Sequence, residues 1–178
     1  MILVIGTPDS GKSSYAEALA LEIFGEEKRA YIATMIPYGE EGSKRVDKHR
    51  RLREGKDFVT YEKPSDIYEL VDVLAREKID NALLECVSNL VGNEIYSDKN
   101  KGLSDEALTE VIISEIHRLD DSLKNLIVVT NEFEGSSEYD EETNRYIHIQ
   151  ALVNERLKAL SKKYIVKEKG EWVIHENN

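Results

Sequence analysis

The chain has 178 residues, 40% of them apolar and 33% charged, which is enough for one domain with a sizeable core. Its net charge of −11 argues against a surface built to hold nucleic acid. A single cysteine, Cys86, excludes an internal disulfide and indicates a reducing compartment. No apolar run reaches the ~18 residues of a membrane span, and the N-terminus lacks the basic leader of a secretion signal. We therefore expect a cytoplasmic protein with a single domain over residues 1–178.

Short apolar runs alternate with amphipathic stretches along the chain. Strands are predicted at residues 2–5, 31–34, 82–86 and 126–130, with two late strands at 164–166 and 172–174 that could form a hairpin around Gly170. Helices are predicted at residues 13–24, 44–53, 65–78, 108–119 and 146–160. Continuous apolar strands separated by helices indicate parallel pairing with both sheet faces covered. The expected fold is α/β, a three-layer sandwich with a mostly parallel central sheet.

The strongest local motif follows the first predicted strand. Residues Gly6-Thr7-Pro8-Asp9-Ser10-Gly11-Lys12-Ser13 match the pattern G-x-x-x-x-G-K-[S/T] between a strand and a helix. In that context, backbone N–H groups and the helix N-terminus hold phosphate oxygens. All eight residues are therefore candidates for nucleotide binding, with Lys12 at the β- and γ-phosphates and the Ser13 hydroxyl as a Mg²⁺ ligand. The motif predicts a fold of the P-loop NTPase type.

A phosphate-bound metal ion also needs an acidic group nearby. The third predicted strand ends in Leu83-Leu84-Glu85-Cys86, which places a carboxylate at the carboxyl edge of the sheet. Ligands of open α/β sheets bind at that edge. We therefore predict that Glu85 supports Mg²⁺ directly or through water, although a strand-end charge without a role is the simple alternative.

A strongly basic segment interrupts this acidic chain. Residues 44–53 contain six basic residues and one acid, so their net charge is +5 and the remainder carries −16. In a helix, Arg45, His49 and Arg53 would share one face. Neighbouring cations would keep His49 neutral and nucleophilic towards a nucleotide α-phosphate, while the arginines, Arg50 included, could hold a polyphosphate. A solvated basic helix face is the simpler explanation, and RNA binding is a third, without an aromatic stacking motif to support it.

Several of these segments occur in the order found in one enzyme family. The chain resembles the bifunctional adenosylcobinamide kinases/adenosylcobinamide-phosphate guanylyltransferases of cobalamin biosynthesis. The matching segments are Gly6–Ser13, Tyr31–Thr34, Glu40-Glu41, Arg45-Val46-x-x-His49-Arg50-x-x-Arg53, Leu83–Cys86, Asn93, Val129–Glu132 and Val153-Asn154. They span most of the chain, and the Tyr-Ile-Ala-Thr segment followed by the Arg/His/Arg run is the most specific part.

The resemblance implies two successive reactions. The γ-phosphoryl group of ATP or GTP passes to the aminopropanol hydroxyl of adenosylcobinamide, and GMP then passes from GTP through a histidine to the new phosphate, giving adenosyl-GDP-cobinamide. It further implies catalysis by Lys12 and His49, with His49 as the GMP carrier, and nucleotide contacts from Thr34, Arg45, Arg50, Arg53 and Glu85. Mg²⁺ as cofactor and a homotrimer are implied as well.

One region departs from the family pattern. Where the family has a loop containing glycine, methionine and proline, residues 133–142 carry five acids: Glu134, Glu138, Asp140, Glu141 and Glu142. In addition, Asn154-Glu155 replaces an Asn-Gln pair, and Glu54 replaces a proline. Two alternatives therefore stay open: a P-loop kinase that phosphorylates a different small alcohol without the guanylyl step, and a regulatory nucleotide-binding protein whose acidic loop is a partner surface.

Overall fold

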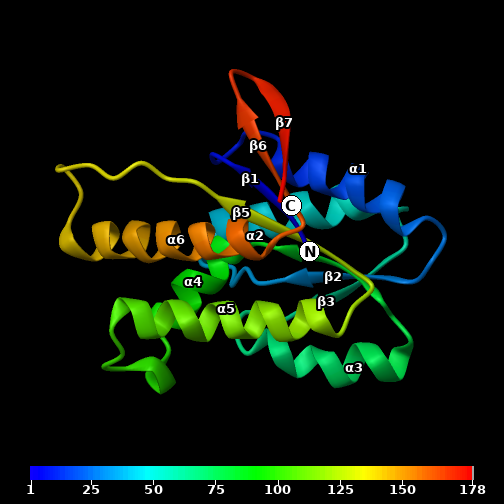
Figure 1. Ribbon diagram of the computed structural model, residues 1–178, viewed down its shortest axis with the longest axis horizontal. Helices are drawn as coiled ribbons and strands as arrows, with labels where there is room; N and C mark the ends of the chain where they lie inside the picture. The colour runs from blue at the N-terminus through cyan, green and yellow to red at the C-terminus, as the bar shows by residue number, and fades with distance from the viewer. Residues whose placement is uncertain (178) are drawn as a thin grey trace.

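A computed structural model describes residues 1–177, with the side chains of all of these except Arg45 and Leu52. Its central sheet has seven strands, with helices on both faces (Figure 1). This arrangement confirms the predicted three-layer α/β fold. No helix within residues 1–177 is both long enough and apolar enough to cross a membrane.

The sheet is parallel except for a hairpin at one end. Its strands are β1 (Ile2–Gly6), β2 (Arg29–Ala33), β3 (Phe58–Glu62), β4 (Asn81–Glu85), β5 (Asn125–Asn131), β6 (Lys163–Glu168) and β7 (Glu171–Glu176). Their order is β3-β2-β4-β5-β1-β6-β7, and only β6 and β7 pair antiparallel. The four main predicted strands and the late hairpin are therefore confirmed, whereas β3 at the sheet edge is an addition to the prediction.

The helices form two layers around the sheet. They are α1 (Lys12–Phe24), α2 (Gly39–Arg53), α3 (Leu70–Glu77), α4 (Val87–Ile95), α5 (Asp105–Asp121) and α6 (Glu141–Leu160), with 3₁₀ turns η1 (Ile67–Glu69) and η2 (Asp98–Asn100). Helix α1 packs Ala16, Ala20 and Phe24 onto one sheet face. Helices α3 to α6 cover the opposite face, where residues such as Leu90 and Ile112 join the larger core cluster.

One helical prediction needs correction, and one helix was not predicted. The helix predicted to open at Ser65 begins as a 3₁₀ turn at Ile67, because Asp66 has a positive φ of 52° and cannot lie in a first helical turn. Helix α4 has no counterpart among the predicted elements. It follows β4 directly and packs against both α5 and α6.

The register of the sheet places the carboxyl ends of four strands side by side. Gly6 of β1 pairs with Asn131 of β5, and Ala33 of β2 pairs with Glu85 of β4. Glu85 also lies opposite Val129 of β5. The connections that follow these strands therefore meet at one edge, where ligands of open α/β sheets bind.

Candidate active site

A cleft of about 520 Å³ opens at this edge of the sheet. Its walls come from the phosphate loop, helix α2 and the residues that follow β2, β4 and β5. The volume lies within the usual range for small-molecule sites. The predicted residues that line it are Pro8, Asp9, Gly11, Lys12, Ser13, His49, Arg50, Arg53 and Glu85.

The phosphate loop is a short connection between β1 and α1. Gly11, directly before the helix, has a φ of 85°, a conformation that favours glycine. A Cβ on Gly6 would lie 2.4 Å from Ser10 Oγ, so a larger residue here would force the Ser10 side chain to move. Lys12 Nζ donates a hydrogen bond to the Thr7 carbonyl at 3.2 Å, and its burial lowers the pKa of the ammonium group. The loop thus holds a buried cation that bound phosphate would stabilise.

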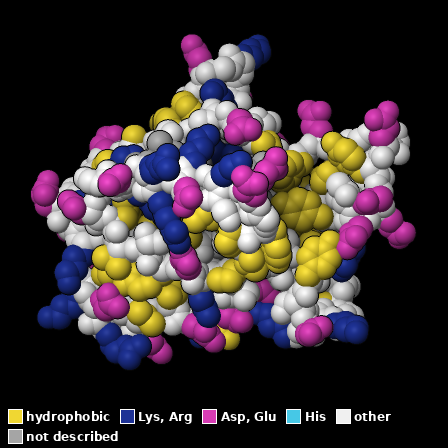
Figure 2. Space-filling model, turned by 180° about the vertical axis from the view of Figure 1, so that it is seen from behind, with side chains coloured by type: hydrophobic (Ala, Val, Ile, Leu, Met, Phe, Trp, Pro, Cys, Tyr) yellow, Lys and Arg dark blue, Asp and Glu magenta, His cyan; other side chains and the backbone are white. Residues whose placement is uncertain are grey.

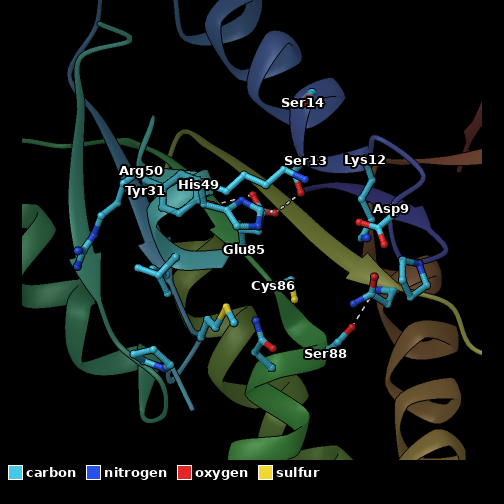
Figure 3. A pocket seen from close by; sticks show the side chains of 18 of the residues that line it. Asp9, Lys12, Ser13, Ser14, Tyr31, His49, Arg50, Glu85, Cys86 and Ser88 are labelled. Carbon is cyan, nitrogen blue, oxygen red and sulfur yellow. Dashed lines mark hydrogen bonds and ion pairs between the residues drawn. The ribbon is translucent and has the colours of Figure 1, made fainter. Parts of the chain in front are cut away.

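Side chains from three different elements lie around the Glu85 carboxylate (Figure 3). Ser13 Oγ donates a hydrogen bond to Glu85 Oε1, and the Tyr31 hydroxyl donates to Oε2 at 2.7 Å. His49 Nδ1 lies 3.7 Å from Oε1. Burial, followed by the charge of Glu85, raises the pKa of Tyr31 and keeps its hydroxyl protonated as a donor.

Ser13 and Glu85 fit a Mg²⁺ site by the chemistry of their oxygen atoms. A hydroxyl and a carboxylate are hard ligands of the kind that Mg²⁺ takes together with substrate phosphates and water. The hydrogen bond between them already places both oxygens together at the start of α1.

Helix α2 brings part of the predicted basic face to the cleft. Among the described side chains, His49 and Arg53 both line it, and the Arg53 guanidinium lies 3.6 Å from the centre of the Tyr31 ring. Arg50 also lines the cleft but points away from Glu85 in Figure 3 and donates to Glu62 at 2.5 Å. The predicted contact from Arg45 lies outside the described side chains.

Thr34 lies behind the cleft and is not among the residues that line it, so its predicted nucleotide contact stays a prediction. Its side chain is completely buried. Its hydroxyl donates to the Cys86 carbonyl at 2.7 Å and accepts from the Cys86 N–H at 2.8 Å. Because both interactions hold the backbone next to Glu85, Thr34 positions the carboxylate instead of forming a cleft wall.

The cleft also contains polar side chains to which the sequence analysis gave no role. Tyr31 contacts Glu85, and Ser88 Oγ accepts a hydrogen bond from the Asn131 N–H at 2.9 Å. The Asn131 Oδ1 atom is buried without a hydrogen-bond partner among residues 1–177. Asn131 could have been found from its position, since it ends a buried strand at the carboxyl edge of the sheet.

Comparison with known proteins agrees with this geometry. The model of the family "Cobinamide kinase / cobinamide phosphate guanyltransferase" matches residues 2–173. The bifunctional adenosylcobalamin biosynthesis protein CobU of Escherichia coli K12 is 34% identical over 142 residues, which cover 74% of this chain and 75% of that protein.

A solved structure shares the fold alone. An ATPase of the type III secretion system of pathogenic bacteria superposes with a TM-score of 0.57 at 10% identity. The match covers 94% of this chain, which spans about half, 51%, of that ATPase chain.

The family match over nearly the whole sequence and the bacterial relative together show that the chain belongs to the cobinamide kinase/cobinamide phosphate guanyltransferase family, enzymes that are both kinases and nucleotidyltransferases.

Proposed function

We propose that this enzyme phosphorylates adenosylcobinamide with ATP or GTP and then transfers GMP to the product through His49. One observation carries the proposal: a single carboxylate, Glu85, contacts Ser13 of the phosphate loop and faces His49 Nδ1 at 3.7 Å. A triphosphate held by the loop would therefore lie within reach of the histidine.

In the first reaction, the phosphate loop positions the nucleotide for transfer of its γ-phosphoryl group. The acceptor hydroxyl oxygen forms a bond to the γ-phosphorus and loses its proton, while the bond to the β–γ bridging oxygen breaks and a nucleoside diphosphate leaves. Lys12 balances the charge on the transferring group. Mg²⁺ held by Ser13 and Glu85 would neutralise phosphate charge and align the leaving group when bound.

In the second reaction, His49 acts as the nucleophile. Its Nδ1 faces Glu85, so we assign the attack on the GTP α-phosphorus to Nε2. Bond formation releases pyrophosphate, and Nδ1 passes its proton to the Glu85 carboxylate, which returns it at the end of the second step. A phosphate oxygen of the phosphorylated acceptor then attacks the same phosphorus, the P–N bond breaks, and the imidazole regains its proton.

The decisive experiment follows GTP labelled at its α-phosphate. The protein should acquire an acid-labile, alkali-stable label without any acceptor, and His49→Ala should abolish this label. His117→Ala is the matched control, since His117 is exposed on α5 beside Asp121. A label that survives in His49→Ala would refute the residue assignment.

The kinase reaction has its own assay. Phosphate should pass from γ-labelled ATP or GTP to adenosylcobinamide, and Lys12→Met should abolish this transfer. If phosphate transfer is intact but His49 acquires no label, the protein is a kinase without the guanylyl step. Binding of nucleotide with neither reaction would instead favour a regulatory protein.

We further propose that the enzyme works as a homotrimer, as its family resemblance implies, and that it is cytoplasmic, as its composition indicates. Sedimentation equilibrium should then give three times the chain mass of 20.3 kDa. A mass equal to that of one chain would rule out the trimer.

A further inference from the structure

A second groove, of about 770 Å³, adjoins the nucleotide cleft. The two share four lining residues: Met35, Ser88, Asn89 and Tyr146. A ligand lying in the groove would therefore have one end at the cleft, within reach of a group transferred from the nucleotide.

Two aromatic side chains of the groove are largely exposed. Tyr38 is 76% exposed and lies directly before α2, and Tyr96 is 66% exposed and lies directly after α4. Met35 and Tyr146 extend this apolar surface to the nucleotide cleft. Figure 2 shows hydrophobic side chains gathered beside a projecting segment with acidic side chains. Exposed apolar patches mark ligand-binding grooves as well as contacts with proteins or membranes, and aromatic rings can stack on a flat ligand.

Hydrogen-bonding groups accompany these rings. Asn93 Nδ2 donates to the carbonyls of Thr34 and Pro64, both at 2.8 Å, which fixes one wall of the groove. The Tyr96 hydroxyl donates to Glu142 at 2.6 Å. Other polar residues in the lining are Glu41, Ser65, Asn89 and Thr143. The groove can therefore accept several N–H donors and also stack on an apolar face.

We propose that this groove binds the corrin ring of the cobinamide acceptor. A corrinoid combines a flat, largely apolar macrocycle with carboxamide groups around its edge, and it needs both kinds of contact. Tyr38 and Tyr96 provide the stacking surface, while Glu41, Asn89 and Glu142 take the carboxamides. The aminopropanol arm then extends past Met35 and Tyr146 to the phosphate loop. The identity of this ligand rests on the function proposed above.

This assignment gives the acidic segment 133–142 a place in the site. Phe133 at its beginning lines the nucleotide cleft, and Glu142 at its end lines the groove. The segment that departs from the family pattern therefore lies along both parts of the site. Of the five acidic residues of this segment, Glu142 lines the groove and would select among the groups on the acceptor's edge.

The test measures binding of cobinamide by equilibrium dialysis, followed by the visible absorbance of the corrin. Tyr96→Ala and Tyr38→Ala should each weaken binding about tenfold, as expected for loss of a stacking ring. Tyr96→Phe keeps the ring and should bind nearly as well as the parent. Ile174→Ala, an exposed residue on β7, is the control for a surface change outside the groove.

A second variant fills the groove without disturbing the fold. Gly92 lines it on α4, and a Cβ there would meet only Tyr146, at 3.8 Å. Because leucine is a better helix former than glycine, Gly92→Leu should fold. Its side chain should lower the affinity for cobinamide at least tenfold. The KM for cobinamide in the kinase assay should rise in parallel, with the KM for nucleotide unchanged.

The outcomes separate this proposal from the proposed function. A parent protein that binds cobinamide but acquires no label on His49 would refute the guanylyl step and leave the groove assignment intact. Unchanged cobinamide affinity in the tyrosine and Gly92→Leu variants would overturn the groove assignment. A lower sedimentation mass in these variants, with cobinamide affinity unchanged, would make the groove an interface between copies of the chain.

Discussion

Glu85 is the residue on which most of the site's contacts converge. Ser13, Tyr31 and His49 reach its carboxylate from α1, β2 and α2, and Thr34 holds the backbone beside it. A carboxylate that is 8% exposed needs hydrogen-bond donors such as Ser13 and Tyr31, because a buried charge without hydrogen bonds is costly. Tyr31 provides the most deeply buried of these donors and thereby fixes the orientation of Glu85.

Removing the Tyr31 hydroxyl should test this positioning role. Tyr31→Phe keeps the ring beneath Arg53 but leaves Glu85 Oε2 without its donor. We expect a loss of about 2 kcal/mol in the free energy of unfolding, measured with urea. The rate of GMP transfer to His49 should fall about tenfold with little change in the KM for GTP.

The matched control for this prediction is Tyr61→Phe. Tyr61 also donates to a carboxylate, Glu77, but at an exposed site on β3. Equal effects of the two substitutions on stability and on GMP transfer would contradict a special role for Tyr31.

At the scale of elements, contacts at the C-terminal end of helix α2 attach it to the rest of the protein. Arg53 stacks on Tyr31, and just beyond the helix Lys56 Nζ lies 2.5 Å from Glu17 Oε2 on α1. Glu17 is completely buried, and its Oε1 has no hydrogen-bond partner among residues 1–177. These contacts connect the helix that carries His49 to the helix that begins at the phosphate loop.

The Lys56–Glu17 pair should respond differently to single and double substitution. Lys56→Met leaves a buried carboxylate without a cation and should lower the free energy of unfolding by about 2 kcal/mol, since Lys56 is 31% exposed. The double variant Glu17→Met/Lys56→Met should recover most of this loss. Urea unfolding measures both values. If the free-energy change of the double variant equals the sum of the two single changes, the two residues do not interact.

At the scale of the whole molecule, acidic groups are buried as well as spread over the surface. Lys99 Nζ lies 2.5 Å from Asp66, 3.1 Å from Glu94 and 3.8 Å from Glu115. One ammonium group, in the connection between α4 and α5, thus forms ion pairs with three carboxylates. Burial, followed by the nearby charge of Glu94, raises the pKa of Glu115 to about 7.

This raised pKa predicts how stability changes with pH. Between pH 4.5 and 7 the folded state binds more protons at Glu115 than the unfolded state, so stability should fall as pH rises. Glu115→Gln should remove this fall and make the protein more stable above pH 7, by up to about 3 kcal/mol. Urea unfolding at several pH values tests it, with Glu106→Gln on the exposed part of α5 as the control. The same slope in parent and Glu115→Gln would contradict the prediction.

How much of the fold the sequence revealed depended on where each element lies. The buried strands β1, β2, β4 and β5 form continuous apolar runs, and the sequence predicted all four. Strand β3 was missed because it is an edge strand whose side chains are exposed or only partly buried. Helix α4 was missed because it is short and contains Ser88, Asn89, Gly92 and Asn93, which are poor helix formers. Packing against α5 and α6 stabilises it instead.

The candidate site also has a part that local sequence predicts and a part that depends on the tertiary structure. The sequence by itself determined the phosphate loop, because eight consecutive residues between a strand and a helix specify their own conformation. It also placed Glu85 at a strand end and gathered the basic residues of α2. Only the tertiary structure decided that Glu85 meets Ser13, 72 positions away, and Tyr31, 54 positions away. It also decided that Thr34 is buried and that a tyrosine-lined groove adjoins the cleft. Such contacts depend on strand order and helix packing, which no local pattern of residues encodes.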